Sequence, residues 1–314
     1  MILKIKSLLV ILFYFILVPV YSQNDDDILG SEEKTNEPVI ATFKTSRIVN
    51  VHSIETVHKS ELDLRITHRF GNAGGTAGGI QSFYGLDNAS DIRIGFEYGI
   101  TDKLNTCISR SKGNIYDTYF KYKFLQQKET GIPLTMVYLA DIAITAETNP
   151  LYEMNLPRRF SYLHELLLAR KFSKNFSLEI IPVWLHRNFV QSFMFDTTDT
   201  KEAKDENNLF GIGIGCRYKF SRRCALLIDY THLFSKYRTK LSGGRADVFE
   251  VTKFYAPLGV GLEIETGGHV FHITFTNATS ILENQYLAFT NDSWMESEYK
   301  FGFTISRTFN IGKK

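Results

Sequence analysis

Cysteine is scarce in this chain: its 314 residues include only Cys107, Cys216 and Cys224. An odd number of cysteines cannot form a complete set of intrachain disulfides, which argues against a small domain held together by disulfide bonds. Long apolar runs are also missing. After residue 22 no stretch holds the roughly eighteen consecutive apolar residues that a membrane-spanning helix needs, so no transmembrane helix is predicted.

An excess of one charge is missing as well. The chain has 36 Lys and Arg against 34 Asp and Glu, and Lys4 and Lys6 lie in its N-terminal stretch. Subtracting these two lysines from 36 leaves 34 basic against 34 acidic residues, so the rest of the chain is close to neutral. A balanced charge does not favour nucleic-acid binding, and we expect no nucleic-acid partner.

The N-terminal region divides into a leader and a polar segment. Residues 1–22 combine Lys4 and Lys6 with the apolar run Leu8–Val20, and we predict that they form a cleaved signal peptide. Residues 23–60 form a polar segment whose acidic first part, residues 23–37, is predicted to be disordered. Residues 38–60 have no clear pattern, and the sequence leaves open whether they pack against or inside the domain that follows.

Aromatic residues are abundant at 14% of the chain, and 22 glycines accompany them. From Glu61 onward the sequence follows a period of two. In "DIRIGFEYGI", residues 91–100, Ile, Phe and Tyr alternate with Asp, Arg, Gly and Glu, and residues 61–70, 115–124 and 208–220 alternate similarly. This pattern is typical of β-strands with one apolar and one polar face.

About twelve such segments follow one another, centred near residues 66, 95, 108, 120, 138, 165, 183, 213, 229, 257, 273 and 303. Short connections such as residues 101–103 alternate with long ones such as residues 71–90, which a soluble sandwich or lipocalin-like barrel has no reason to do. We therefore predict an all-β fold: residues 61–314 form a transmembrane up-and-down antiparallel β-barrel of about 12 strands, with short periplasmic turns and longer extracellular loops.

The polar faces of these strands carry too many charges for a dry core, where each unpaired charge would be costly. We therefore expect the apolar faces to meet lipid and the charged faces to line a lumen. Residues 158–171 and 176–189 are apolar on both faces, which indicates something apolar inside the barrel. The expected lumen-lining residues either rigidify a narrow barrel or form a selective pore; they are Asp63, Arg65, Arg69, Arg93, Glu97, Asp117, Lys121, Lys123, Arg217, Asp229 and Glu263.

A glycine-rich stretch, "GNAGGTAGG", occupies residues 71–79. A phosphate-binding loop of the P-loop type requires a following Lys-Ser/Thr and a helix, and the sequence predicts neither. We predict instead a loop between two strands. With the "YGLD" that follows, the residues of this loop motif are Gly74, Gly75, Gly78, Gly79, Tyr84, Gly85 and Asp87.

The segments "HRFGNAGGTAGGIQSFYGLDNASDIRIGFEYGITDKL" and "SRSKGNIYDTYFKYKFLQQ" resemble an uncharacterised outer-membrane β-barrel family typical of Bacteroidetes, a domain of unknown function. The resemblance runs from about Thr42 to the C-terminus and is densest over residues 61–127. It implies a barrel in the outer membrane of a Gram-negative bacterium. It brings no catalytic residues, ligand or transported solute.

Three functions fit this interpretation. A channel or small-solute porter with a charged lumen is favoured, and the alternatives are a filled barrel acting as an anchor or interaction protein and a barrel-embedded hydrolase or acyltransferase. We find no catalytic constellation and expect no enzyme, no cofactor and no metal site, since His269 and His272 would point to opposite faces of a strand. The expected partners are outer-membrane lipid and lipopolysaccharide, a small solute, and the barrel assembly machinery, whose recognition strand the C-terminal "EYKFGFTISRTFNIGKK" resembles.

Overall fold

The computed structural model describes residues 36–146, 155–190, 192–194, 202–235 and 254–312. The predicted signal peptide, residues 1–22, and the acidic stretch up to residue 35 lie outside the described residues. Within the described part, no helix has the length and apolar character needed to cross a membrane.

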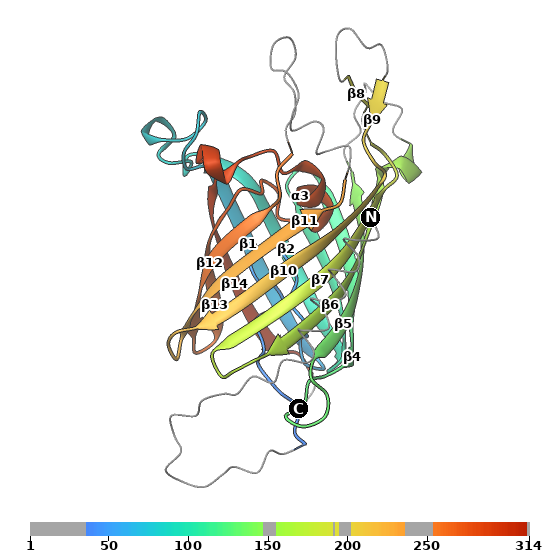
Figure 1. Ribbon diagram of the computed structural model, residues 1–314, viewed down its shortest axis with the longest axis vertical. Helices are drawn as coiled ribbons and strands as arrows, with labels where there is room; N and C mark the ends of the chain where they lie inside the picture. Colours follow the sequence, from blue (N-terminus) through green and yellow to red (C-terminus); the bar gives the residue numbers. More distant parts are fainter. Residues whose placement is uncertain (1–35, 147–154, 191, 195–201, 236–253, 313–314) are drawn as a thin grey trace.

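Twelve antiparallel strands close into a barrel in which each strand pairs with its neighbours along the chain and the first pairs with the last (Figure 1). This confirms the predicted all-β barrel. The strands are β1 (Glu61–Asn72), β2 (Ala89–Thr101), β3 (Leu104–Ser111), β4 (Ile115–Leu125), β5 (Thr135–Thr145), β6 (Phe160–Lys171), β7 (Phe176–Arg187), β10 (Asn208–Lys219), β11 (Cys224–Leu233), β12 (Leu258–Thr266), β13 (His269–Thr276) and β14 (Lys300–Asn310).

Two details differ from the sequence-based expectation. The strand predicted near residue 257 is β12, which begins only at Leu258 because residues 254–257 still belong to the preceding loop. A small two-stranded sheet, β8 (Ser192–Met194) with β9 (Glu202–Lys204), also forms within the connection between β7 and β10, outside the barrel wall. Both differences lie in long connections, where the period of two gives no signal.

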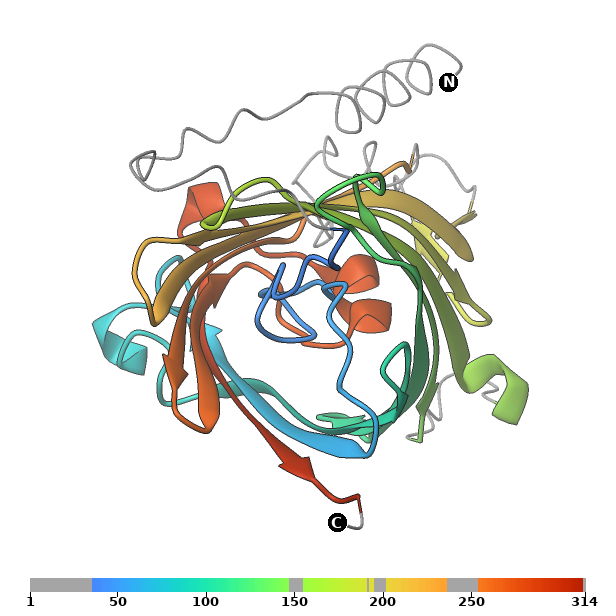
Figure 2. The ribbon, with the colours of Figure 1, turned by 90° about the horizontal axis from the view of Figure 1, so that it is seen from below.

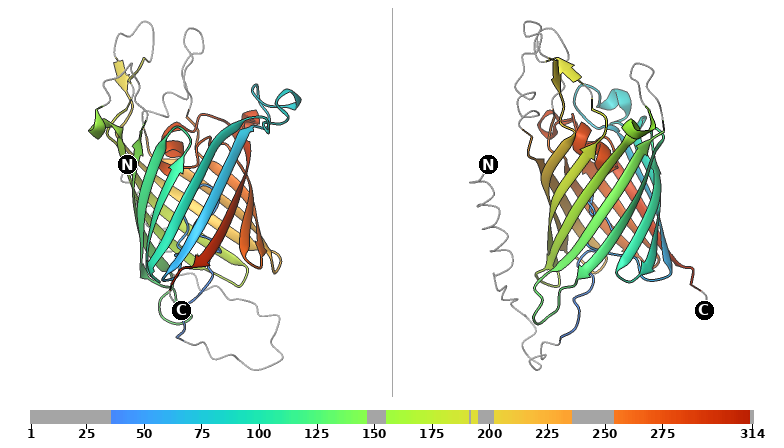
Figure 3. Two further views of the ribbon diagram at one scale, coloured as in Figure 1. Left: turned by 180° about the vertical axis from the view of Figure 1, so that it is seen from behind. Right: turned by 90° about the vertical axis from the view of Figure 1, so that its right-hand side faces the viewer.

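The two ends of the barrel differ, as predicted. At the short-turn end, connections such as residues 102–103 and 267–268 are tight, and residues 59–60 lead into β1 there. At the long-loop end, the connections are residues 73–88, 146–159, 188–207, 234–257 and 277–299, with residues 112–114 as the short exception. Figure 3 shows the same division from two further sides.

The outer face of the barrel is apolar and the inner face is charged. On β2, β3 and β4, outward positions such as Phe96, Ile108 and Phe120 are exposed, Ile108 at 67%. The residues that alternate with them, such as Glu97 and Lys121, are buried inside the ring of strands. An apolar surface of this extent around a closed barrel is the surface that lipid covers.

A lysine in place of Phe120, at the middle of β4, should cost about 2–4 kcal/mol of folding free energy in lipid, because it places a charge at mid-membrane. Phe124 lies on the same face but near the short-turn end. A lysine there should cost only about 0–1 kcal/mol, because its ammonium can reach the interface. Urea titration of both variants and the wild type in vesicles of one lipid measures the difference. Equal costs would contradict the placement of this face in lipid.

Candidate functional site

The lumen of the barrel is occupied by two segments of the chain itself. Residues 41–55 enter from the short-turn end, and most side chains between Thr42 and Ile54 are buried. Residues 277–299, here called the inner loop, fold in from the long-loop end and carry the short helix α3 (Glu283–Phe289). Figure 2, a view along the barrel, shows the N-terminal segment and α3 inside the ring of strands.

The first segment forms a tight hairpin, residues 45–53, here called the lumen hairpin. The backbone N–H of Ser53 donates to the carbonyl of Ser46 at 3.0 Å, and the N–H of Ile48 donates to the carbonyl of Val51 at 2.9 Å. Arg47 and His52 lie opposite each other between these two bonds. The tip, residues 48–51, therefore leaves several backbone N–H groups free to bind the barrel wall.

Asp229 of β11 holds the hairpin tip. Its carboxylate accepts hydrogen bonds from the backbone N–H groups of Val49, Asn50 and Val51 at 2.9, 2.6 and 3.2 Å, and from the Asn50 side-chain amide at 2.8 Å. These four hydrogen bonds give the buried carboxylate the partners that water would otherwise provide. This one residue therefore accepts hydrogen bonds from most of the N–H donors of the tip.

Glycines on the strands beside Asp229 make room for the tip. Gly215 on β10 and Gly259 on β12 pair directly with Asp229 across the sheet. A Cβ atom on Gly259 would lie 2.6 Å from Val49 Cγ1, and one on Gly215 would overlap the side chain of Ile48. The row Gly215–Asp229–Gly259 is therefore a socket shaped for the lumen hairpin.

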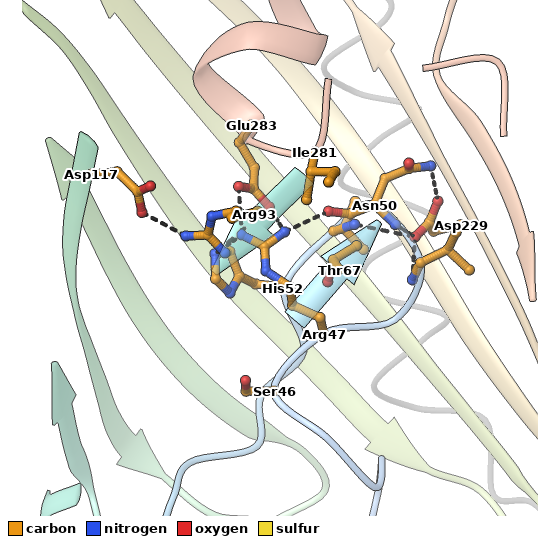
Figure 4. Close-up of polar contacts among 12 residues, drawn as sticks. Ser46, Arg47, Asn50, His52, Thr67, Arg93, Asp117, Asp229, Ile281 and Glu283 are labelled. Atoms are coloured by element: carbon orange, nitrogen blue, oxygen red, sulfur yellow. Dashed lines mark hydrogen bonds and ion pairs between the residues drawn. The ribbon is translucent and has the colours of Figure 1, made fainter. Parts of the chain in front are cut away.

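An ion pair joins the lumen hairpin to the inner loop. The Arg47 guanidinium donates to both carboxylate oxygens of Glu283 in α3, at 2.7 and 2.8 Å, and both side chains are buried (Figure 4). Breaking a buried pair by removing one partner typically costs about 3–5 kcal/mol, because the other charge is left uncompensated. The two segments thus support each other at mid-lumen.

His52 completes this cluster as a neutral residue. Its Nε2 lies 3.1 Å from Arg47 Nη2, so it accepts a hydrogen bond from the guanidinium. Burial, together with the positive charge of Arg47, lowers the pKa of His52 well below its usual value. Although burial alone would lower the pKa of Arg47, the Glu283 carboxylate raises it above its usual value. Arg47 is therefore the cation of the cluster.

Two wall residues, Lys121 on β4 and Glu97 on β2, hold the N-terminal segment. Lys121 Nζ donates to the carbonyls of Ser46, Ser53 and Glu55 at 3.1–3.2 Å, and Glu97 accepts from Ser46 Oγ at 2.5 Å.

The guanidinium of Arg69 performs the same task for the inner loop. It donates to the carbonyls of Ala278 and Ser280 at 2.9 and 2.6 Å, and also to Asn50 Oδ1 in the lumen hairpin at 3.1 Å. Arg69 is therefore a second point at which both segments meet one wall residue.

All eleven predicted lumen residues lie on the inner side of the wall, and none is more than 8% exposed. Four of them, Arg69, Glu97, Lys121 and Asp229, bind the lumen hairpin directly. The other seven pair along the wall or line a cavity. The wall pairs are Arg93–Asp117 at 2.5 Å, Arg65–Asp63 at 3.1 Å and Arg217–Glu263 at 2.7 Å.

The residues that sequence analysis missed are those of the two lumen segments, above all Arg47, Asn50, His52 and Glu283. They lie in irregular segments where neither period two nor spacing distinguishes them. One indirect signal was correct: strands apolar on both faces predicted an apolar filling. Leu163, Leu167, Ile181 and Leu185 of β6 and β7 form a buried cluster with the hairpin and α3, whose members there are Ile48, Val51, Tyr286 and Leu287.

A cavity of about 850 Å³ remains at the short-turn end, below the lumen hairpin. Asp63, Arg65 and Lys123 line it, with Lys44 and Glu55 from the N-terminal segment. It reaches from the end of the barrel to the hairpin residues Thr45 and Ser46.

The glycine-rich loop lies at the long-loop end, away from the lumen cluster. The expectation that no helix follows it was wrong, since Ile80–Ser82 form one turn of 3-10 helix, η1. Three residues make too short a helix to present an anion site. Gly75, Gly79 and Gly85 adopt left-handed φ values of 70°, 95° and 83°. Gly74 and Gly78 pack against each other, and Tyr84 and Asp87 are exposed.

Cysteines, candidate metal ligands and buried histidines are the remaining described residues that could carry chemistry. Cys107, Cys216 and Cys224 are free thiols. No group of three or more His, Cys, Asp or Glu in the described part is placed to hold a metal ion. The two buried histidines, His52 and His272, contact Arg47 and Glu263 rather than a serine or cysteine nucleophile.

Comparison with known proteins gives a family and several distant structural likenesses. The family described as "Membrane bound beta barrel domain (DUF5777)" matches residues 43–309. A search of curated proteins gives no match.

Among solved structures, the NanC porin has 11% sequence identity and a TM-score of 0.47, covering 79% of this chain and 98% of its own. An outer membrane channel from Pseudomonas putida F1 has 11% identity and a TM-score of 0.45, covering 82% and 98%. LpxR from Salmonella typhimurium has 11% identity and a TM-score of 0.36, covering 80% and 100%. These TM-scores, all below 0.5, are too low to transfer any property to this chain.

Replacing Asp229 with alanine should release the hairpin tip, because three backbone N–H groups lose their acceptor. Hydrogen–deuterium exchange over residues 45–53 should then rise at least tenfold, the equivalent of about 1.4 kcal/mol of lost protection. Asp229→Asn, which keeps one carbonyl oxygen, should have a smaller effect. Asp63→Ala is the matched control, since Asp63 pairs with Arg65 on the wall. Unchanged exchange in Asp229→Ala would show that the socket does not hold the hairpin.

Acidification should loosen the same hairpin. The folded pKa of His52 lies below its unfolded value of about 6.5, so the neutral-histidine contribution is present above that pH and is lost as pH falls through it. Exchange at residues 45–53 should therefore increase below about pH 6.5. His52→Gln, which keeps a neutral polar side chain, should lack this part of the increase. An identical pH profile in both proteins would rule out His52 as its source.

Proposed function

Because this chain belongs to the family of membrane-bound β-barrel domains, we propose that it is a channel or small-solute porter of the outer membrane of a Gram-negative bacterium, closed by its own lumen hairpin and inner loop. The short-turn end faces the periplasm and the long-loop end faces the outside in this proposal. One observation carries it: the closing segments are held by charged wall residues whose hydrogen bonds water can replace.

The opening step follows from these contacts. When the lumen hairpin withdraws toward the periplasm, Asp229, Glu97 and Lys121 lose their partners on it and gain water instead. Such an exchange leaves no wall charge buried and unpaired, which is the condition for a low cost of opening. The exposed wall carries charges of both signs, which favours polar solutes over apolar ones.

A second candidate function is supported by a different observation. Ile48 and Val51 of the hairpin and Tyr286 and Leu287 of the inner loop pack on the apolar inner wall of β6 and β7. Burying a large apolar side chain contributes about 1.5–3 kcal/mol of stability, and this free energy opposes withdrawal of the hairpin from the lumen. This favours a permanently filled barrel that serves as an anchor or interaction protein. A barrel-embedded hydrolase has no comparable support.

Planar-bilayer recording separates the two candidates. In the channel proposal, wild-type protein opens rarely, and Arg47→Ala or Glu283→Ala opens at least tenfold more often, because either change removes one partner of a buried pair whose loss costs about 3–5 kcal/mol. The matched control is Arg217→Ala, which breaks a buried Arg–carboxylate pair of the same 2.7 Å length between wall strands only.

The outcomes have distinct meanings. Conductance that rises in the Arg47 and Glu283 variants but not in the Arg217 variant supports closure by the hairpin and inner loop. Silence in the wild type and in all three variants, with each protein shown to be folded by heat-modifiable migration, rejects the channel and leaves the filled barrel. An equal rise in the Arg217 variant assigns the leak to general loosening of the barrel.

A further inference from the structure

The glycine-rich loop between β1 and β2 is not used by the proposed channel, yet it has a fixed fold. Its backbone bonds include the Tyr84 N–H to the Gly79 carbonyl at 2.7 Å and the Gly85 N–H to the Ser82 carbonyl at 3.0 Å. Phe83 and Tyr84 adopt left-handed φ values of 47° and 55°. Residues with side chains disfavour this conformation by about 1–2 kcal/mol each, so the surrounding bonds hold it in place.

This fixed fold presents apolar side chains outward. Ile80 is 80% exposed, Phe83 61% and Tyr84 56%, and Leu86 is also exposed. Residues 71–86 contain no Asp, Glu, Lys or Arg, so Asp87 is the only charged residue of the loop between β1 and β2. Strained backbone that displays adjacent aromatic rings indicates a surface made to contact something.

The position of the loop identifies what it contacts. Figures 1, 2 and 3 show it extending sideways beyond the barrel wall at the long-loop end, rather than over the mouth of the lumen. At the base of the loop, β1 and β14 carry stacked rings, with Phe70 and Phe301 at 5.6 Å between centroids. The apolar loop thus continues the lipid-facing surface of the barrel outward along the plane of the membrane.

We propose that residues 79–86 are a lateral membrane anchor that lies in the outer leaflet. Ile80, Phe83 and Tyr84 insert at the boundary between headgroups and acyl chains, where aromatic side chains are favoured. The occupant of this surface is lipid, because residues 79–86 are uncharged, expose large apolar side chains and are continuous with a face that already meets lipid. An extracellular protein or a second copy of the chain would instead leave the side chains out of reach of acyl chains.

Tryptophan fluorescence tests the anchor in full-length protein reconstituted in phosphatidylcholine vesicles with brominated acyl chains. Each variant adds one tryptophan, and subtracting the wild-type signal removes Trp184 and Trp294. Phe120→Trp, on the lipid-facing side of β4, gives the quenching of a probe immersed in lipid. Thr130→Trp, in the exposed loop at the short-turn end, gives the quenching of a probe in water.

Phe83→Trp should be quenched by brominated lipid at least about half as strongly as Phe120→Trp, with an emission maximum to the blue of Thr130→Trp. Quenching and emission like those of Thr130→Trp would overturn the anchor and assign the patch to a protein partner or to water. Ile80→Trp repeats the test at a residue with ordinary backbone conformation, in case the Phe83 variant does not fold. Neither outcome depends on conductance.

Discussion

A charged side chain on the inner wall of a narrow barrel needs either water or a partner, because an unpaired buried charge costs several kcal/mol. This constraint governs the whole interior of the protein. The wall carries acidic and basic side chains in strand after strand, and the space between them is filled by the lumen hairpin and the inner loop. Backbone carbonyls and N–H groups of these segments then serve as the partners that water would otherwise provide.

The interior has two sides with different chemistry. Toward β1–β4 and β11 the filling is held by hydrogen bonds and charges from residues such as Arg69, Lys121 and Asp229. Toward β6 and β7 it is held by packing of aliphatic side chains such as Leu163 and Ile181. Polar contacts can be exchanged for water at little cost, whereas apolar packing cannot. The balance between these two sides decides whether the lumen opens.

Mutual support links the two filling segments. The lumen hairpin contributes Arg47 and the inner loop contributes Glu283, and neither charge has an equivalent partner on the wall. The glycine row beside Asp229 shows that the wall is also shaped for the hairpin, since side chains at Gly215 or Gly259 would collide with it. A filling that is built into both the wall and the loops is a feature of the fold, and any transport must work by moving it.

The sequence by itself determined the barrel, because alternation with a period of two is a local property that each strand carries on its own. It also determined which residues face inward, from Asp63 on β1 to Glu263 on β12, since strand geometry fixes the side on which alternate residues lie. Residues 158–171 and 176–189, which are apolar on both faces, even indicated an apolar filling.

Only the tertiary structure decided what fills the lumen. Asn50 meets Asp229 across 179 residues, and Arg47 meets Glu283 across 236 residues. Arg47, Asn50 and Glu283 all lie in segments with no periodicity, so nothing local in the sequence marks them. Whether a charged wall surrounds water or chain depends on contacts between such distant segments, and these exist only once the barrel has closed around them.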